Sequence, residues 1–234
     1  MEIAPGKANR VLVSYGYSFM KTTIIYDNTA FRNDLRADWG FAALVEAKGK
    51  KILFDTGASG SILLENMGKL GIAPDGISDV FISHAHFDHT GGLWAFLDLN
   101  PDVGVWVPRS FRGVRNAKTV VAVGKSRKLH DGIYSTGELA GIEQSLCVAT
   151  RLGVVVIAGC SHPDIAHILA SASEFGSVYG IIGGLHGNRP EKLASLNLIC
   201  ATHCTQYRLE IQSLYPETYI EGGAGKTMKF PESS

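Results

Sequence analysis

The strongest constraint on this chain is the stretch 83–92, which reads Ser-His-Ala-His-Phe-Asp-His-Thr-Gly-Gly. It places three imidazoles and a carboxylate close together, directly after a short apolar run. In an extended segment the side chains of residues i and i+2 point the same way, so His84 and His86 can bind one ion. Asp88 and His89 follow a bend and can reach a second ion. We therefore predict two adjacent metal sites, with a solvated polar loop as the alternative.

The ligand types in this stretch also indicate which metal to expect. They are mainly imidazoles, and no carboxylate replaces His84 or His86, so zinc is expected, with manganese or iron as alternatives. A site with two divalent metal ions lowers the pKa of a bound water and polarises a phosphoryl or carbonyl oxygen. Hydrolysis is the default chemistry of such a site.

The H-x-H-x-D-H pattern followed by Thr-Gly-Gly resembles the metallo-β-lactamase superfamily. Leu53–Gly57 is similar to the strand that ends in an Asp turn in that family. Three later segments resemble one branch, the 7,8-dihydropterin-6-methyl-4-(β-D-ribofuranosyl)aminobenzene 5'-phosphate synthase-like proteins. They are Gly159–His162, Gly183–His186 and Thr202–Thr205.

This resemblance implies an α/β fold, a four-layer αββα sandwich with two mixed sheets flanked by helices. It also implies two ligand sets. The first ion would take His84, His86 and His162, and the second would take Asp88, His89 and His203.

Several roles remain open at this stage. Cys160 stands where many members have an Asp that bridges the ions, so it is either a ligand or a small buried thiol. His130 competes with His162 as the third ligand of the first ion. His186 follows two glycines and is expected to contact the substrate or donate a proton, with Asp88 as the other catalytic candidate. Asp55 is expected to orient a histidine ligand.

Composition favours one domain over residues 1–234. The chain has 45% apolar residues and contains no run rich in Pro, Ser and Gly that would divide it. No apolar run is long enough to span a bilayer, and the first twenty residues do not resemble a signal peptide, so we expect a cytoplasmic protein that does not contact a membrane. The four cysteines do not form the pattern of a disulfide framework.

The charge pattern points to a small anionic substrate. The formal net charge is zero, which argues against nucleic acid as a partner. From 103 to 130, however, there are seven basic residues and no acidic one. Arg109, Arg112 and Arg115 are the candidate substrate-binding residues, and an ordinary solvated basic face is the alternative. The oligomeric state is left open.

We therefore expect a dinuclear metal-dependent enzyme that acts on a phosphorylated, pterin-like or other anionic small molecule. The name of the branch implies that a dihydropterin methyl diphosphate joins a ribosylaminobenzene phosphate, with loss of diphosphate. The alternatives are a phosphoester, lactone or thioester hydrolase, and a metal-dependent sensor without turnover. A fold and a metal site transfer between relatives more safely than a reaction does.

Hydrophobic periodicity and turn residues predict alternating strands and helices, which indicates α/β layers. Strands are expected at 11–15, 22–26, 41–46, 51–54, 79–82, 103–107, 120–123, 132–136, 145–149, 153–158, 178–182 and 196–201. Helices are expected at 59–70, 90–99, 163–173, 188–194 and 205–214.

Overall fold

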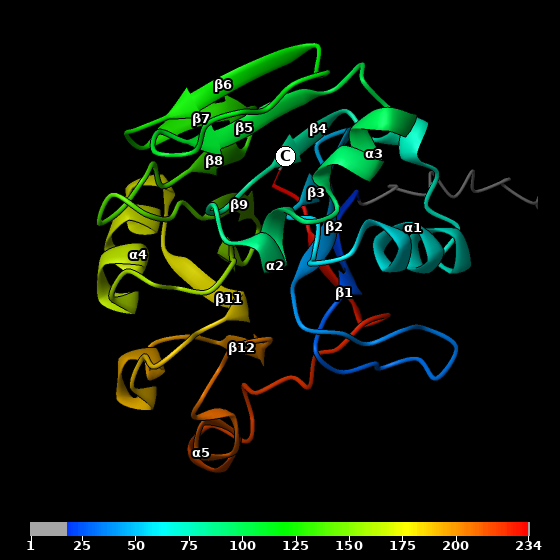
Figure 1. Cartoon of the computed structure of the whole chain (residues 1–234). Helices are drawn as coiled ribbons and strands as arrows, with labels where there is room; N and C mark the ends of the chain where they lie inside the picture. Colours follow the sequence, from blue (N-terminus) through cyan, green and yellow to red (C-terminus); the bar gives the residue numbers. More distant parts are fainter. Residues whose placement is uncertain (1–17, 234) are drawn as a thin grey trace, which may run out of the picture.

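The computed structural model describes residues 18–233, in which two β-sheets pack face to face (Figure 1). The first sheet has the strand order β13-β1-β2-β3-β4-β5-β6 and is mixed, because β1, β2 and β3 pair antiparallel whereas β3 to β6 pair parallel. Its strands are β1 (Phe19–Tyr26), β2 (Ala42–Ala47), β3 (Lys50–Phe54), β4 (Asp79–Phe81), β5 (Gly104–Pro108), β6 (Thr119–Val123) and β13 (Thr227–Pro231).

The second sheet has the order β12-β11-β10-β9-β8-β7. Within this sheet, strands β10, β11 and β12 are parallel to one another, and the remaining neighbouring strands pair antiparallel. The strands are β7 (Arg127–His130), β8 (Ile133–Ser135), β9 (Leu146–Thr150), β10 (Gly153–Ala158), β11 (Val178–Gly184) and β12 (Leu198–Thr202).

Three apolar cores hold the layers together. The central core lies between the sheets and includes Phe54 and Ile157. A second core packs α1 and α3 on the first sheet, and a third packs α4 and α5 on the second. The expected four-layer αββα sandwich is thereby confirmed. The helices are α1 (Gly60–Lys69), α2 (Phe87–Thr90), α3 (Leu93–Leu99), α4 (Ile165–Ala172) and α5 (Arg208–Leu214), with 3₁₀ turns η1 (Pro74–Gly76), η2 (Ser173–Phe175) and η3 (Pro190–Leu193).

Parallel strands bring the chemically active loops to one edge. The loops after β3 and β4 leave the first sheet, and those after β10, β11 and β12 leave the second. Since the carboxyl ends of parallel strands lie on the same side of a sheet, these loops meet where α2 lies in the centre of Figure 1.

The elements expected from sequence differ from the observed ones in a few places. The helix expected at 90–99 is wrong as a single element, because Gly91 and Gly92 separate α2 from α3. A Cβ at either glycine would collide with a backbone oxygen of Thr56 or Ala58, so the chain needs glycine for this close approach. Strands β7 and β13 were not anticipated. The strand expected at 11–15 lies outside the described residues.

The helices between residues 18 and 233 include none that is both long and apolar enough to cross a membrane.

Candidate metal centre

Three histidines form the first cluster at this edge. His84 Nε2 lies 3.1 Å from His86 Nδ1, and the ring of His162 lies 4.8 Å and 4.7 Å from the rings of these two residues. One ligand atom from each of the three lies within 4.8 Å of the others. His84 is buried, whereas His86 is exposed, so the cluster opens to solvent on one side.

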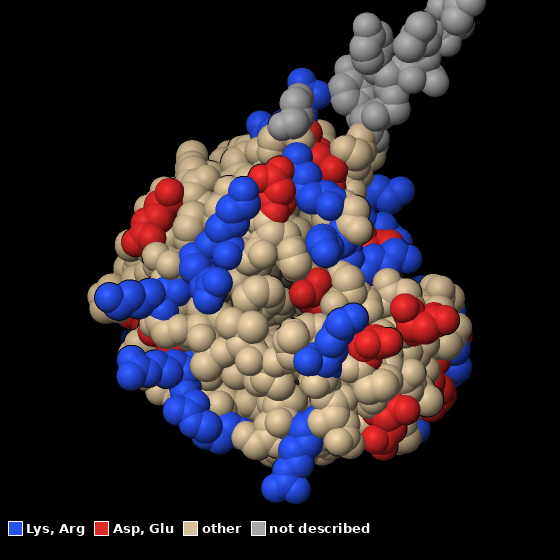
Figure 2. Space-filling model, turned by 90° about the horizontal axis from the view of Figure 1, so that it is seen from above, with Lys and Arg blue, Asp and Glu red and all other residues tan. Residues whose placement is uncertain are grey.

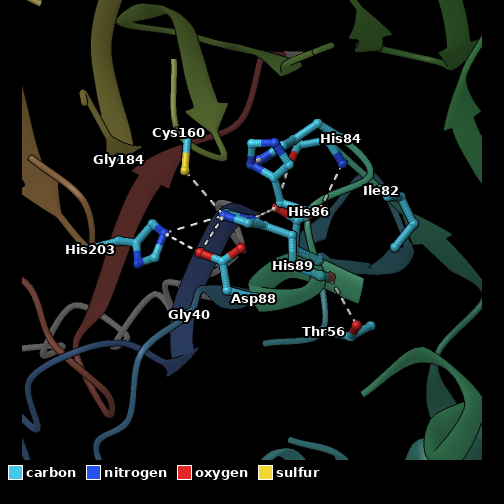
Figure 3. A network of polar contacts seen from close by, with 12 residues as sticks. Gly40, Thr56, Ile82, His84, His86, Asp88, His89, Cys160, Gly184 and His203 are labelled. Atoms are coloured by element: carbon cyan, nitrogen blue, oxygen red, sulfur yellow. Dashed lines mark hydrogen bonds and ion pairs between the residues drawn. The ribbon is translucent and has the colours of Figure 1, made fainter. Parts of the chain in front are cut away.

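Asp88, His89 and His203 form the second cluster beside the first (Figure 3). His203 Nε2 lies 3.3 Å from Asp88 Oδ2 and 3.2 Å from His89 Nε2. All three residues are buried. The structure therefore brings together the six side chains that the resemblance implied, in the two expected groups of three.

Cys160 lies between the two clusters. Its Sγ is 3.2 Å from His89 Nε2 and, in Figure 3, points toward that ring. It forms one compact group of ligand atoms with His84 and His89, and another with His203 and Cys204. This buried thiol is thus placed where it can contact ions bound in either cluster.

The donor atoms are spaced as a metal ion requires. A tetrahedral zinc ion with ligands at about 2.0–2.1 Å separates two nitrogen ligands by about 3.3 Å. The distances from His84 to His86, from His89 to His203 and from His203 to Asp88 are 3.1 to 3.3 Å and fit this spacing. His162 Nε2 is buried and has no hydrogen-bond partner in the described part of the chain. Such an atom is costly to bury unless it binds something, so the residues present fit a pair of divalent ions.

Electrostatics keep His84 and His162 neutral and Asp88 ionised. Burial and the neighbouring imidazoles lower the pKa of His84 strongly and that of His162 to about 4. Burial opposes the ionisation of Asp88, but the hydrogen bond with His203 and the charges of His89 and His203 outweigh it and lower its pKa. At neutral pH these three groups therefore offer lone pairs to a cation.

Asp55 orients ligands of both clusters. Its Oδ2 lies 2.7 Å from His89 Nδ1 and accepts a hydrogen bond from the Ser83 hydroxyl, which lies 2.9 Å from His84 Nδ1. Its Oδ1 accepts from the Ser83 backbone N–H at 2.7 Å. Asp55 adopts the left-handed conformation, with φ of 53°, directly after β3. This carboxylate therefore fixes the orientation of two imidazole rings.

His203 and Asp88 are held by residues that the sequence did not single out. Asn28 Oδ1 lies 2.9 Å from His203 Nδ1, and Asp27 accepts a hydrogen bond from the His203 backbone N–H at 2.9 Å. Trp39 Nε1 donates to Asp88 Oδ2 at 2.8 Å, although half of Trp39 is exposed. No recognisable motif surrounds these residues. Only the tertiary structure reveals their role.

Glu143 clamps the loop that carries Cys160 and His162. Its carboxylate accepts three consecutive backbone N–H groups, from Cys160 at 2.9 Å, Ser161 at 3.0 Å and His162 at 2.8 Å. The side chain is fully buried, and burial raises its pKa in spite of these hydrogen bonds. Ser161 has a φ of 57°, so this short loop holds a left-handed turn at a fixed position.

The remaining histidine candidates lie in different places. His186 is exposed, and its ring lies 4.9 Å from that of His162, so it stands at the rim of the first cluster. His130 is on β7, where its Nε2 lies 3.1 Å from Asp79 Oδ1 and its ring packs against Trp106. The structure therefore groups His162, and not His130, with His84 and His86.

The basic run does not form a continuous patch. Figure 2 looks down on the molecule from the β5–β6–β7 end, and its Lys and Arg side chains stand apart, with acidic side chains among them. Lys118 and Lys128 pair with Asp102 and Asp131, which flank the run. Arg109, Arg112 and Arg115 are exposed between β5 and β6. Arg112 donates to the backbone carbonyls of Arg109 and Phe111, and Arg115 lines a surface hollow with Trp94.

Fold and site together indicate the class: the chain has the fold of the metallo-β-lactamase superfamily. The superfamily profile matches residues 38–125, which include the histidine-rich loop.

Among individual relatives, the chain is 26% identical to the 7,8-dihydropterin-6-methyl-4-(beta-D-ribofuranosyl)-aminobenzene-5'-phosphate synthase of Methanocaldococcus jannaschii, over 89% of this chain and 95% of the relative. A crystal structure of a metal-dependent hydrolase of the beta-lactamase superfamily is also 26% identical, with a TM-score of 0.73 over 91% of this chain and 100% of the other. A diphosphatase of the PhnP family, 13% identical, shares the fold with a TM-score of 0.62 over 93% and 99% of the two chains.

Proposed function

We propose that this protein is a dinuclear metal-dependent enzyme that acts on a phosphorylated, anionic small molecule. One observation carries the proposal: two sets of three ligand atoms, each set within 4.8 Å, lie side by side with a thiol between them. Two divalent ions bound there, expected to be zinc, would act as Lewis acids and make a water nucleophilic near neutral pH.

The residues around the clusters have distinct tasks in this proposal. His84, His86 and His162 would hold one ion, and Asp88, His89 and His203 the other, with Cys160 in contact with both. Asp55 and Asn28 keep the rings turned inward. His186, exposed at the rim, can hold the proton that a leaving group requires.

The proposed substrate is phosphorylated and pterin-like or similarly anionic, and the M. jannaschii relative supports this class by its name. Both hydrolysis and a transfer that releases diphosphate fit such a substrate. In this proposal Arg109, Arg112 and Arg115 contribute a remote phosphate contact. Their single replacement by Ala should raise KM for a phosphorylated substrate while the metal content stays constant.

The test is turnover by the zinc-loaded protein. Bis(4-nitrophenyl) phosphate and 4-nitrophenyl acetate report generic hydrolysis. Release of diphosphate from a dihydropterin methyl diphosphate, with and without a ribosylaminobenzene 5'-phosphate, separates hydrolysis from transfer. We expect turnover of phosphorylated compounds that His84→Ala abolishes. Binding of metal without turnover of any of these compounds would instead identify a sensor and refute the enzyme proposal.

A further inference from the structure

A polar hollow adjoins the first histidine cluster, on the side of η3. It has a volume of about 370 Å³, and His162 and His186 are among its lining residues. Because a water molecule takes about 30 Å³ in the liquid, the hollow has room for a phosphate group and several waters. A ligand in it would lie directly beside the proposed metal centre.

The hollow carries one cation that no carboxylate neutralises. Lys192 and Asp164 both line it, but they pair with each other at 2.5 Å. Arg189 has no partner among the ion pairs of residues 18–233, and its guanidinium lies over the Tyr207 ring, 5.0 Å from the centroid. This contact orients the guanidinium and leaves its positive charge in place.

The walls of the hollow are held in position. The Asn188 side chain accepts a hydrogen bond from the Ile165 backbone N–H at 2.9 Å and donates to the Ser161 carbonyl at 2.8 Å. His186 has a φ of 44°, a conformation that is unfavourable for a residue with a side chain. Strained residues persist where the surrounding structure enforces them, and here the exposed imidazole lines the same hollow as Arg189.

We infer that this hollow is the anion subsite of the enzyme. Arg189 binds oxygens of a phosphate group of the substrate, and His186 contacts the same group from the side of the metal centre. Arginine suits this task because its planar guanidinium can donate two parallel hydrogen bonds to phosphate. The inference rests on the proposed function and names the group that would hold the substrate nearest to the metals.

The test is equilibrium binding of inorganic phosphate and of phenylphosphonate to the zinc-loaded full chain by calorimetry. Arg189→Ala should weaken the binding of both at least about fivefold, the effect of losing a charged hydrogen bond that is mostly solvated. Arg127→Ala is the matched control, because Arg127 is an exposed arginine over an aromatic ring, that of Trp106 on β5. We expect the control to bind both probes as the original protein does. Equal dissociation constants for Arg189→Ala and the original protein, or no binding to the original protein at millimolar concentration, would overturn the inference.

Kinetics separate the failure of this inference from that of the proposed function. Arg189→Ala should raise KM for a phosphorylated substrate several-fold and leave kcat/KM for 4-nitrophenyl acetate unchanged. Active enzyme whose KM does not respond to Arg189→Ala refutes the subsite alone. Arg189-dependent binding of phosphate by a protein without turnover refutes the enzyme proposal and keeps the subsite.

Discussion

Single residues decide which ion is lost when the centre is altered. The Nε2 atom of His84 lies 3.1 Å from His86 in the first cluster, whereas Asp88 is in ion-pair distance of His89 and His203 in the second. We therefore predict that His84→Ala lowers the metal content from about two ions per chain to about one by emptying the first site. Asp88→Ala should weaken mainly the second site. Elemental analysis after dialysis, without chelator, measures both ratios.

His130→Ala is the control for this prediction, because His130 lies on β7 next to Asp79 and not at the clusters. It should retain the full metal content. If His130→Ala loses an ion and His162→Ala retains both, the assignment of the third ligand is wrong.

Cys160 is predicted to bind metal through sulfur. Its Sγ lies 3.2 Å from His89 Nε2 and forms compact groups of ligand atoms with residues of both clusters. Cobalt substituted for zinc should then give a sulfur-to-cobalt charge-transfer absorption in the near ultraviolet, which Cys160→Ser abolishes. Cys147→Ser is the matched control, since Cys147 is a buried thiol on β9. An unchanged absorption in Cys160→Ser would mean that another thiol, such as Cys204, is the ligand.

At the scale of elements, the loop between β10 and α4 depends on Glu143. The carboxylate satisfies three consecutive N–H groups, and an amide in its place offers one oxygen acceptor instead of two. We predict that Glu143→Gln lowers the free energy of unfolding by about 1–3 kcal/mol, the cost of a buried N–H without a partner. It should also weaken the binding of the first ion, because the backbone of His162 loses its anchor.

Chemical denaturation and a zinc titration measure these two effects. Glu138→Gln is the control, because Glu138 lies in the same segment but accepts the exposed N–H of Ser110. If Glu143→Gln binds zinc as tightly as the original protein, the Glu143 carboxylate does not position His162 for metal binding.

Several elements could be predicted from local sequence alone. The β2–β3 hairpin follows from two apolar runs around a turn, in which Lys48 and Gly49 adopt positive φ. Strand β7 escaped prediction because Arg127–His130 is a mostly exposed, charged segment that pairs only with β8. Strand β13 was missed because its pairing partner is β1, some two hundred residues earlier in the chain. Such strands are specified by tertiary pairing more than by their own composition.

The candidate metal centre, like the fold, could be predicted from the sequence only in part. The loop 83–92 contains four of the six candidate ligands in one motif, and spacing alone grouped these four. Trp39, Asn28 and Glu143 escaped because each contacts a ligand from a distant segment; Asn28 is 175 positions from His203. A side chain that acts through a long-range hydrogen bond leaves no periodicity or spacing in the sequence.

At the scale of the whole molecule, the centre connects the two sheets. His84, His86, Asp88 and His89 follow β4 of the first sheet, whereas His162 follows β10 and His203 follows β12 of the second. Each cluster therefore contains ligands from both sheets. Ions bound there would link the two halves at the edge where the loops meet, beyond the apolar core that already joins them.

This arrangement predicts that metal removal lowers the thermal stability of the whole protein. An ion that binds only the folded state, at one hundred times its dissociation constant, stabilises that state by about 2.7 kcal/mol. For a chain of this size 1 kcal/mol corresponds to about 2–4 °C, so loss of one ion should lower Tm by roughly 5–11 °C. Differential scanning calorimetry before chelation, after it and after zinc is restored measures the shift. The double variant His84→Ala with Asp88→Ala should unfold at the same temperature with and without zinc. Equal Tm values for the chelated and zinc-loaded original protein would show that the clusters do not bind the metal in the folded state. This result would refute the proposed metal centre.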